Sequence, residues 1–267
     1  MNVVRPDKRL RILKWLVDGA GVRAIERNEG VHRDTILRLL VNAGYNCDDF
    51  LDITMRDLRR EHWEIDEMWT FCRKKEKRLT PDEKIEGVWG DQYLFLAIGQ
   101  RSKLIPAFLI GKRNEVNACK FMKDLAGRLR TSVRHRLSTD GFLPYPEAVR
   151  LAFKNAVDYG VIVKEFTATS VVIARRIICG CFDKEKICTS HVERGNLTIR
   201  TFMRRYVRRA LGFSKKLENL WAATALNVAH YNFCWKHRTL KMTPAMAAGL
   251  TGYRWTFEEL LAAAGVL

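Results

Sequence analysis

The chain has 267 residues, enough for one large domain or two modest ones with a packed core. It contains 47 lysines and arginines against 30 aspartates and glutamates, so its formal net charge is +17, and this excess favours a polyanionic partner such as nucleic acid. No apolar run approaches the roughly 20 residues that a membrane-spanning helix needs, which argues against a membrane protein. Seven cysteines, an odd number, and a start without an apolar leader lead us to expect reduced thiols in a cytoplasmic protein.

Residues 1–46 predict a small helical domain. Apolar residues recur at helical spacing in residues 7–20 and 31–44, with Gly19 and Gly44 as stops, and a short helix fits between them. Three short helices with a tight turn before the last are typical of a helix-turn-helix domain that binds DNA. The third helix would present four side chains to a DNA groove: His32, Arg33, Thr35 and Arg38. The alternative is a helical cap that binds nothing.

Residues 47–61 are polar and mixed in charge, and we interpret them as a linker. From residue 62 the apolar period changes to that of strands. The order of expected elements up to residue 200 is strand, strand, strand, helix, strand, helix, strand, helix. The first helix would begin at an Asn114 cap, with four apolar residues facing inward: Val116, Phe121, Leu125 and Leu129. This order predicts an α/β domain over residues 62–267, a mixed sheet flanked by helices, which is the ribonuclease-H-like arrangement.

Three carboxylates stand out by their positions in this order. Asp66 lies in the first strand, Asp140 closes the fourth, and Glu193 begins a helix after the fifth. The first and fourth strands are neighbours in this topology, and open sheets bind ligands at such strand ends. Clustered carboxylates favour a hard divalent cation such as Mg²⁺. Two ions about 4 Å apart would support phosphoryl transfer on DNA.

Each carboxylate alone is weak evidence for a metal site, because most acidic side chains are simply exposed to solvent on the protein surface. The helix beginning near Glu193 would carry three arginines on the same stripe: Arg200, Arg204 and Arg208. Glu193 would then face a metal ion while the arginines follow a phosphate backbone. In the alternative interpretation, Glu193 only stabilises the positive start of a solvated basic helix.

Four motifs carry a resemblance to a known family: "IDEMW" at 65–69, "STDG" at 138–141, "TSHVERGNLTIR" at 189–200 and "HYNFCWKHRTLKMTPAMAAGL" at 230–250. With them the chain resembles the bacterial DDE transposases of the insertion-sequence-one family, in particular single-frame members with a helix-turn-helix front end. The similarity spans nearly the whole chain. It implies a metal-binding catalytic triad of Asp66, Asp140 and Glu193.

The resemblance further implies a ribonuclease-H-like catalytic domain that uses Mg²⁺ or Mn²⁺. The partners it implies are double-stranded DNA, at the element's terminal inverted repeats and at the target, and a homo-oligomer acting on paired ends. The expected location is the bacterial cytoplasm, in association with the nucleoid. Two departures concern Gly195, where many relatives have glutamine, and residues 1–46, which lack the cysteines of a zinc finger.

The cysteines near the third motif raise the question of a second metal site. Cys179, Cys181 and Cys188, with His191 nearby, would supply four zinc ligands, but their spacing lacks the usual C-x₂₋₄-C pair. We therefore favour buried free thiols.

The leading hypothesis is a transposase that cleaves DNA at the ends of an insertion sequence and joins the freed 3′ end to a target. Two alternatives remain open. One is a catalytically silent DNA-binding regulator derived from a transposase, against which the retention of all three acids argues. The other is a ribonuclease-H-like nuclease without strand transfer, which would use the same metal site.

Overall fold

The computed structural model describes residues 4–166 and 171–267. It is an α/β protein with a six-stranded mixed sheet flanked by helices, as the order of elements predicted. The chain divides into two compact units, which we call the sheet unit and the helical unit. The sheet unit consists of Met55–Met68 and Tyr93–Leu197. The helical unit consists of Met1–Thr54, Trp69–Gln92 and Thr198–Leu267.

The sheet has the strand order β3-β2-β1-β4-β5-β6. Its strands are β1 (His62–Cys72), β2 (Gly90–Gly99), β3 (Phe108–Gly111), β4 (His135–Thr139), β5 (Val157–Phe166) and β6 (Val171–Cys179). Strands β1, β4 and β5 run parallel to one another, whereas β3 and β6 are antiparallel to β2 and β5. The expected adjacency of the first and fourth strands is thereby confirmed.

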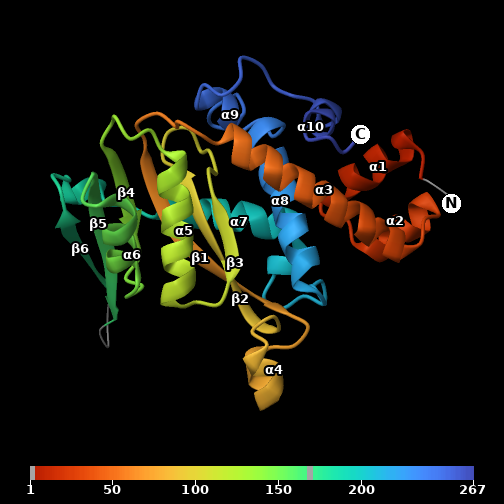
Figure 1. Cartoon of the computed structure of the whole chain (residues 1–267), viewed down its shortest axis with the longest axis horizontal. Helices are drawn as coiled ribbons and strands as arrows, with labels where there is room; N and C mark the ends of the chain where they lie inside the picture. Colours follow the sequence, from red (N-terminus) through yellow and green to blue (C-terminus); the bar gives the residue numbers. More distant parts are fainter. Residues whose placement is uncertain (1–3, 167–170) are drawn as a thin grey trace. The chain divides into compact units, whose positions relative to one another are not determined.

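Two helices of the sheet unit, α5 (Glu115–Arg128) and α6 (Tyr145–Phe153), pack against each other on one side of the sheet (Figure 1). Asn114 caps α5 as predicted, through a hydrogen bond from the backbone N–H of Asn117. Phe121 and Leu125 are fully buried, but the inward position predicted for Val116 is wrong, since that residue is 59% exposed. Val116 precedes Phe121 by five residues, which places it about 140° around the helix from the buried stripe.

The far edge of the sheet differs from the sequence prediction. Helix α6 ends at Phe153, Lys154 and Asn155 take positive φ angles of 48° and 63°, and β5 begins at Val157. Strand β6 was not predicted at all. It belongs to an apolar stretch, residues 168–188, whose first residues lie outside the described residues.

The N-terminal part of the helical unit contains α1 (Pro6–Val17), α2 (Val22–Glu29) and α3 (Arg33–Thr54). Their shared core is formed by four buried apolar side chains: Ile12, Ile25, Val31 and Ile36. Helix α2 ends at Gly30, whose φ of 60° is the left-handed conformation that glycine adopts without a steric penalty.

Helix α3 continues through Gly44, so the helix end predicted there is wrong. A Cβ at Gly44 would lie 2.4 Å from the Cα of Ala222 in α8 (Leu217–Phe233), so the glycine permits a close approach of two helices. Residues 47–54 of the expected linker are therefore helical, and Cys47, Phe50 and Leu51 among them are buried. The Phe50 ring packs on the rings of Phe233 and Trp255.

The rest of the helical unit contains α4 (Pro81–Ile85), α9 (Pro244–Ala247) and α10 (Phe257–Ala263). Helix α10 begins with a capping box in which Thr256 and Glu259 exchange hydrogen bonds. Among the residues that the structure describes, no helix combines the length and the apolar character that a membrane crossing requires.

Candidate metal centre

An acidic cluster lies where β1 and β4 run side by side. The register of these parallel strands pairs Ile65 with Thr139, and an aspartate follows each of them, Asp66 on β1 and Asp140 after β4. Ligand oxygens of Asp66, Glu67 and Asp140 all lie within 4.8 Å of one another. Two aspartates separated by 74 residues in sequence are thus brought together by the sheet.

Glu67 belongs to this cluster, although strand alternation predicts that it points away from Asp66. Its carboxylate accepts hydrogen bonds from Arg113 Nε at 2.5 Å and from the Tyr145 hydroxyl at 2.8 Å, and its side chain is 3% exposed. These two partners hold the long side chain of Glu67 beside the aspartates. Glu67 is therefore a buried member of the acidic cluster.

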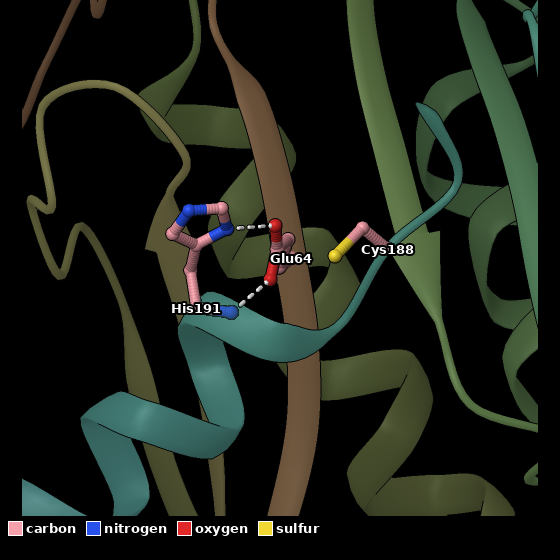
Figure 2. Close-up of side chains that lie close together, drawn as sticks. All are labelled: Glu64, Cys188 and His191. Atoms are coloured by element: carbon pink, nitrogen blue, oxygen red, sulfur yellow. Dashed lines mark hydrogen bonds and ion pairs between the residues drawn. The ribbon is translucent and has the colours of Figure 1, made fainter. Parts of the chain in front are cut away.

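Helix α7 (Ser190–Phe202) is attached to β1 by a buried carboxylate, that of Glu64. Glu64 Oε2 accepts from the backbone N–H of His191 at 2.7 Å (Figure 2). It also accepts from the backbone N–H of Val192 at 3.3 Å. Its other oxygen, Oε1, lies 2.5 Å from His191 Nδ1. The first turn of a helix leaves backbone donors without partners and carries partial positive charge, so a buried carboxylate there fixes where the helix begins.

A second contact ties the next turn of α7 to the acidic cluster. Asn196 Nδ2 donates to Asp66 Oδ2 at 2.8 Å, and Asn196 is 5% exposed. Its Oδ1 is buried and has no hydrogen-bond partner among the residues that the structure describes. The helix is regular across Gly195, where a Cβ would lie 3.2 Å from Ile98 Cδ1, so a small residue suits this close packing.

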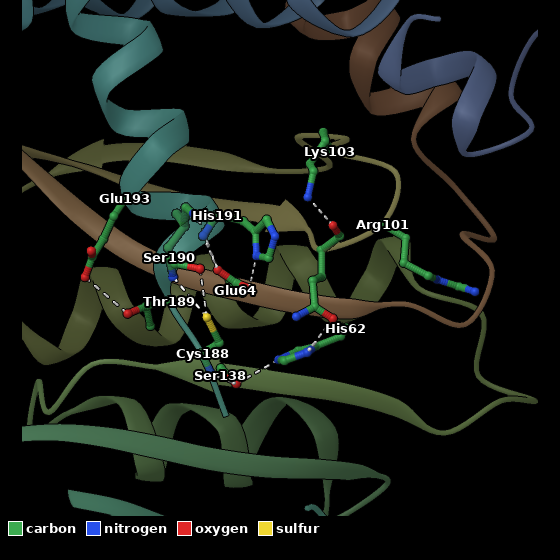
Figure 3. A network of polar contacts seen from close by, with 12 residues as sticks. His62, Glu64, Arg101, Lys103, Ser138, Cys188, Thr189, Ser190, His191 and Glu193 are labelled. Carbon is green, nitrogen blue, oxygen red and sulfur yellow. Dashed lines mark hydrogen bonds and ion pairs between the residues drawn. The ribbon is translucent and has the colours of Figure 1, made fainter. Parts of the chain in front are cut away.

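Glu193 lies in the first turn of α7, between these two attachments. It is exposed and accepts a hydrogen bond from Thr189 Oγ1 at 3.2 Å (Figure 3). Glu193 is not among the acids whose ligand oxygens lie within 4.8 Å of one another. Its negative charge is nevertheless among those that raise the pKa of Asp66. The structure therefore brings the three predicted carboxylates into one neighbourhood, with Asp66 and Asp140 in contact range and Glu193 at its edge.

Burial raises the pKa of Asp66 from its ordinary 3.8 to about 7, and the charges of Glu67, Asp140 and Glu193 act in the same direction. Burial and then the charge of Asp140 also raise the pKa of Glu67, against the opposing effects of its hydrogen bonds from Tyr145 and Arg113. The guanidinium of Arg113 lies 3.9 Å from Asp140. Among the ion pairs given for the described residues, Arg113 is the cation that pairs with this cluster, and the carboxylates outnumber it.

The cluster fits a hard divalent cation. Its donors are all carboxylate oxygens, the ligands that Mg²⁺ and Mn²⁺ prefer. The side chain of Asn196 contacts Asp66 through its Nδ2. Its Oδ1, an acceptor without a partner among the described residues, is buried on the same amide group. Burial and the neighbouring charges raise the pKa of Asp66, and the positive charge of an ion would oppose both effects by favouring the ionised carboxylate.

The residues predicted to contact DNA occupy two places. His32, Arg33 and Arg38 are exposed and Thr35 is half-buried, all at or just before the first two turns of α3. Arg38 donates to Thr35 Oγ1 at 3.1 Å. Arg33, Thr35 and Arg38 lie in the first two turns of α3, and His32 immediately precedes the helix.

The predicted arginine stripe on α7 is wrong. The helix ends at Phe202 because Met203 has φ −125° and ψ 94°, outside the helical region. Arg200 is in the last turn of α7, Arg204 begins a short 3₁₀ turn, and Arg208 follows that turn. The three arginines therefore do not continue one helical face from Glu193.

All seven cysteines are free thiols. The expected burial of three of them is wrong, since Cys181 is exposed and Cys179 and Cys188 are half-buried. Cys179 Sγ donates to the backbone carbonyl of Val157 at 3.4 Å. In the part of the chain that the structure describes, Cys188 and His191 instead form a group with Glu64. Sequence reasoning missed Glu64, although its position two residues before Asp66 places both on the same face of β1.

Comparison with protein-family models and with curated proteins gives no match for this chain. The functional interpretation therefore depends on the residues and their geometry.

Proposed function

We propose that the chain is a DDE transposase that binds the ends of an insertion sequence and catalyses metal-dependent DNA cleavage and strand transfer. The observation that carries the proposal is the cluster of Asp66, Glu67 and Asp140 on neighbouring parallel strands, with Glu193 at its edge. Further support comes from the six-stranded mixed sheet, which is compatible with a ribonuclease-H-like fold, and from the four sequence motifs.

The residues that would hold divalent ions are Asp66, Asp140 and Glu193. The family that the motifs resemble implies two such ions. Ions bound there would help to activate an attacking oxygen and to stabilise the leaving oxygen of a phosphodiester. Magnesium or manganese suits this all-oxygen set.

The surrounding residues have positioning roles in this proposal. Glu64 holds the first turn of α7 through its backbone N–H groups, which keeps Glu193 beside the cluster. Asn196 orients the Asp66 carboxylate through its Nδ2. Arg113 and Tyr145 hold Glu67 and leave Asp140, whose side chain is 38% exposed, open to solvent and substrate.

Double-stranded DNA is the proposed partner. The net charge of +17 favours a polyanion, and the exposed side chains at the start of α3 have the types that contact bases and phosphates in a helix-turn-helix domain. Arg204 and Arg208, both exposed, and Arg200 are proposed contacts to the phosphate backbone. A homo-oligomer that pairs two DNA ends completes the proposal.

The test uses the purified protein and a supercoiled plasmid that carries the coding region with its natural flanks. In Mg²⁺ or Mn²⁺ we expect nicks at discrete positions in the flanks and joining of the freed 3′ ends to target DNA. Asp140→Asn should abolish both reactions while leaving the fold intact, as judged by circular dichroism. Asp183→Asn is the matched control, because Asp183 is an exposed aspartate paired with Lys186 rather than with the cluster.

Each outcome of this experiment distinguishes the hypotheses. Discrete nicking without joining indicates a nuclease, and sequence-selective binding without any cleavage indicates a silent regulator. An Asp140→Asn protein that nicks its terminal DNA as fast as the unaltered chain would rule out the acidic cluster as the catalytic site.

A further inference from the structure

A second group of metal-ligating side chains lies next to the acidic cluster. Glu64 of β1, Cys188 and His191 each offer one ligand atom, and these atoms lie within 4.8 Å of one another (Figure 2). The group combines an oxygen, a sulfur and a nitrogen ligand, whereas the acidic cluster has oxygen alone. Glu64 is fully buried, and Cys188 and His191 are half-buried, so solvent reaches one side of the group.

The two carboxylate oxygens of Glu64 have different hydrogen-bond partners. Oε2 accepts the backbone N–H groups at the start of α7, while Oε1 has His191 Nδ1 as its neighbour. An ion between Oε1 and Nδ1 would replace the direct contact of these two atoms and leave the attachment of the helix unchanged.

The surroundings of Cys188 suit a metal-bound thiolate. Its Sγ accepts from the backbone N–H of Ser190 at 3.3 Å and lies 2.9 Å from the Ser190 hydroxyl (Figure 3). The backbone N–H of Ser190 would remain a donor to the sulfur of a metal-bound thiolate.

We propose that Glu64, Cys188 and His191 form a zinc site, with a water molecule in the fourth position. Borderline-soft Zn²⁺ binds this mixture of carboxylate, thiolate and imidazole, whereas Mg²⁺ does not favour sulfur. Bonds of about 2.0 to 2.3 Å in a tetrahedron place ligand atoms roughly 3.3 to 3.8 Å apart, so small side-chain shifts complete the site. Binding releases the thiol proton of Cys188 and any proton shared by His191 and Glu64.

This site does not depend on the proposed function, because none of its ligands belongs to the acidic triad. It does connect to that triad through the chain, since His191 and Glu193 share the first turn of α7. Zinc would fix the start of this helix more firmly than the hydrogen bonds alone. Lys103, whose ammonium interacts electrostatically with Glu64 and Cys188, is the nearby cation that an ion must compete with.

Cobalt substitution tests the proposal directly, because Co²⁺ occupies zinc sites and gives absorption bands for thiolate ligation. We expect one equivalent of Co²⁺ to saturate a thiolate band in the metal-free protein, kept reduced without thiols, and Zn²⁺ to abolish that band; Co²⁺ at the all-oxygen acidic cluster would give no such band. Cys188→Ser should remove the band, and His191→Gln should weaken binding at least tenfold. Cys181→Ser is the matched control, because Cys181 is an exposed cysteine outside the group, and it should keep the full band. Asp140→Asn should also keep it.

A second measurement needs no substitution and covers the case in which a variant fails to fold. Zn²⁺ should slow the alkylation of Cys188 at least tenfold in the unaltered protein, located by peptide mass spectrometry, and leave the rate at Cys181 unchanged. The proposal is overturned if Co²⁺ gives no thiolate band, if the band survives in folded Cys188→Ser, or if Zn²⁺ leaves the alkylation of Cys188 unaffected.

Discussion

At the scale of single residues, Asp66 makes the stability of the protein depend on pH. Its pKa is about 7 in the folded chain and near 3.8 when unfolded, so the folded state binds the proton more tightly. The stabilising contribution of the neutral carboxyl is fully present below the unfolded pKa and is lost as the pH rises through 7. We expect the metal-free protein to lose up to about 4 kcal/mol of unfolding free energy from this group between pH 4 and pH 8.

Chemical denaturation across this pH range measures the effect, with Asp66→Asn as the comparison. The asparagine variant should lack this component of the pH dependence, whereas Asp183→Asn should keep it. Mg²⁺ should restore stability at pH 8 more than at pH 5, because the ion binds the ionised carboxylates. Identical pH profiles for the unaltered chain and for Asp66→Asn would contradict the raised pKa.

Glu193 has two possible roles that one substitution separates. Glu193→Gln keeps the size and the acceptor for Thr189 but removes the charge that would hold an ion, so cleavage should collapse while DNA binding persists. If Glu193 only stabilises the start of α7, the change should cost up to about 1 kcal/mol of stability and leave cleavage nearly unaltered. Cleavage and filter binding on the same preparation, alongside thermal unfolding, decide between the roles.

The sequence located Asp66 and Asp140 because each stands at a recognisable place in a strand. It did not reveal Glu64 or Asn196, whose importance comes from the way α7 packs on β1. Nor did it predict Glu67 in the cluster, because strand alternation ignores the reach of a long side chain held by Arg113 and Tyr145. The sequence did not reveal these residues because their hydrogen-bond partners lie far away along the chain.

At the scale of elements, the packing of α3 on α8 depends on Gly44. A Cβ there would lie 2.4 Å from both the Cα and the Cβ of Ala222, a distance that no rotamer change relieves. Gly44→Ala should therefore lower the free energy of unfolding by about 1 to 3 kcal/mol, although alanine is the better helix former. Urea denaturation measures the loss.

The matched control for this substitution is Gly252→Ala, because a Cβ at Gly252 meets no atom within 4 Å. It should change the unfolding free energy by less than about 0.5 kcal/mol. A Gly44→Ala protein as stable as the unaltered chain would show that α3 and α8 do not approach as closely as the structure has them.

The elements with a clear apolar period were predictable, among them β1 and α5. The errors fall where tertiary contacts override local signals. Gly44 resembled a helix stop but permits close packing, and α7 was extended past Phe202 because the arginines continue its spacing. Strand β6 lies within an apolar stretch for which the helix and strand patterns give no clear choice.

At the scale of the whole molecule, the first three helices are not an independent domain. The second half of α3 is buried through Cys47, Phe50 and Leu51, and its Phe50 ring packs on Phe233 and Trp255 near the C-terminus. A fragment of residues 1–60 would expose this apolar face to water at a cost of about 25 cal/mol per Å². We expect the fragment to be partly unfolded or aggregated, as measured by circular dichroism and limited proteolysis. A cooperative thermal transition in the monomeric fragment would contradict this.

The net charge of +17 predicts binding to any DNA, whereas the exposed start of α3 predicts selective binding. Both predictions are tested in the whole chain. Neutralised phosphates release counterions, so binding to any DNA should weaken steeply as salt rises. If Arg33 and Arg38 read bases, Arg33→Ala or Arg38→Ala should weaken binding to the DNA flanking the coding region by about 1 to 3 kcal/mol and binding to random DNA by less. Arg150→Ala is the control, because Arg150 is an exposed arginine paired with Glu147 on α6. Equal losses on both DNAs, with a lower salt slope, would instead assign these arginines to the phosphate backbone, and no loss on either would remove α3 from the DNA interface.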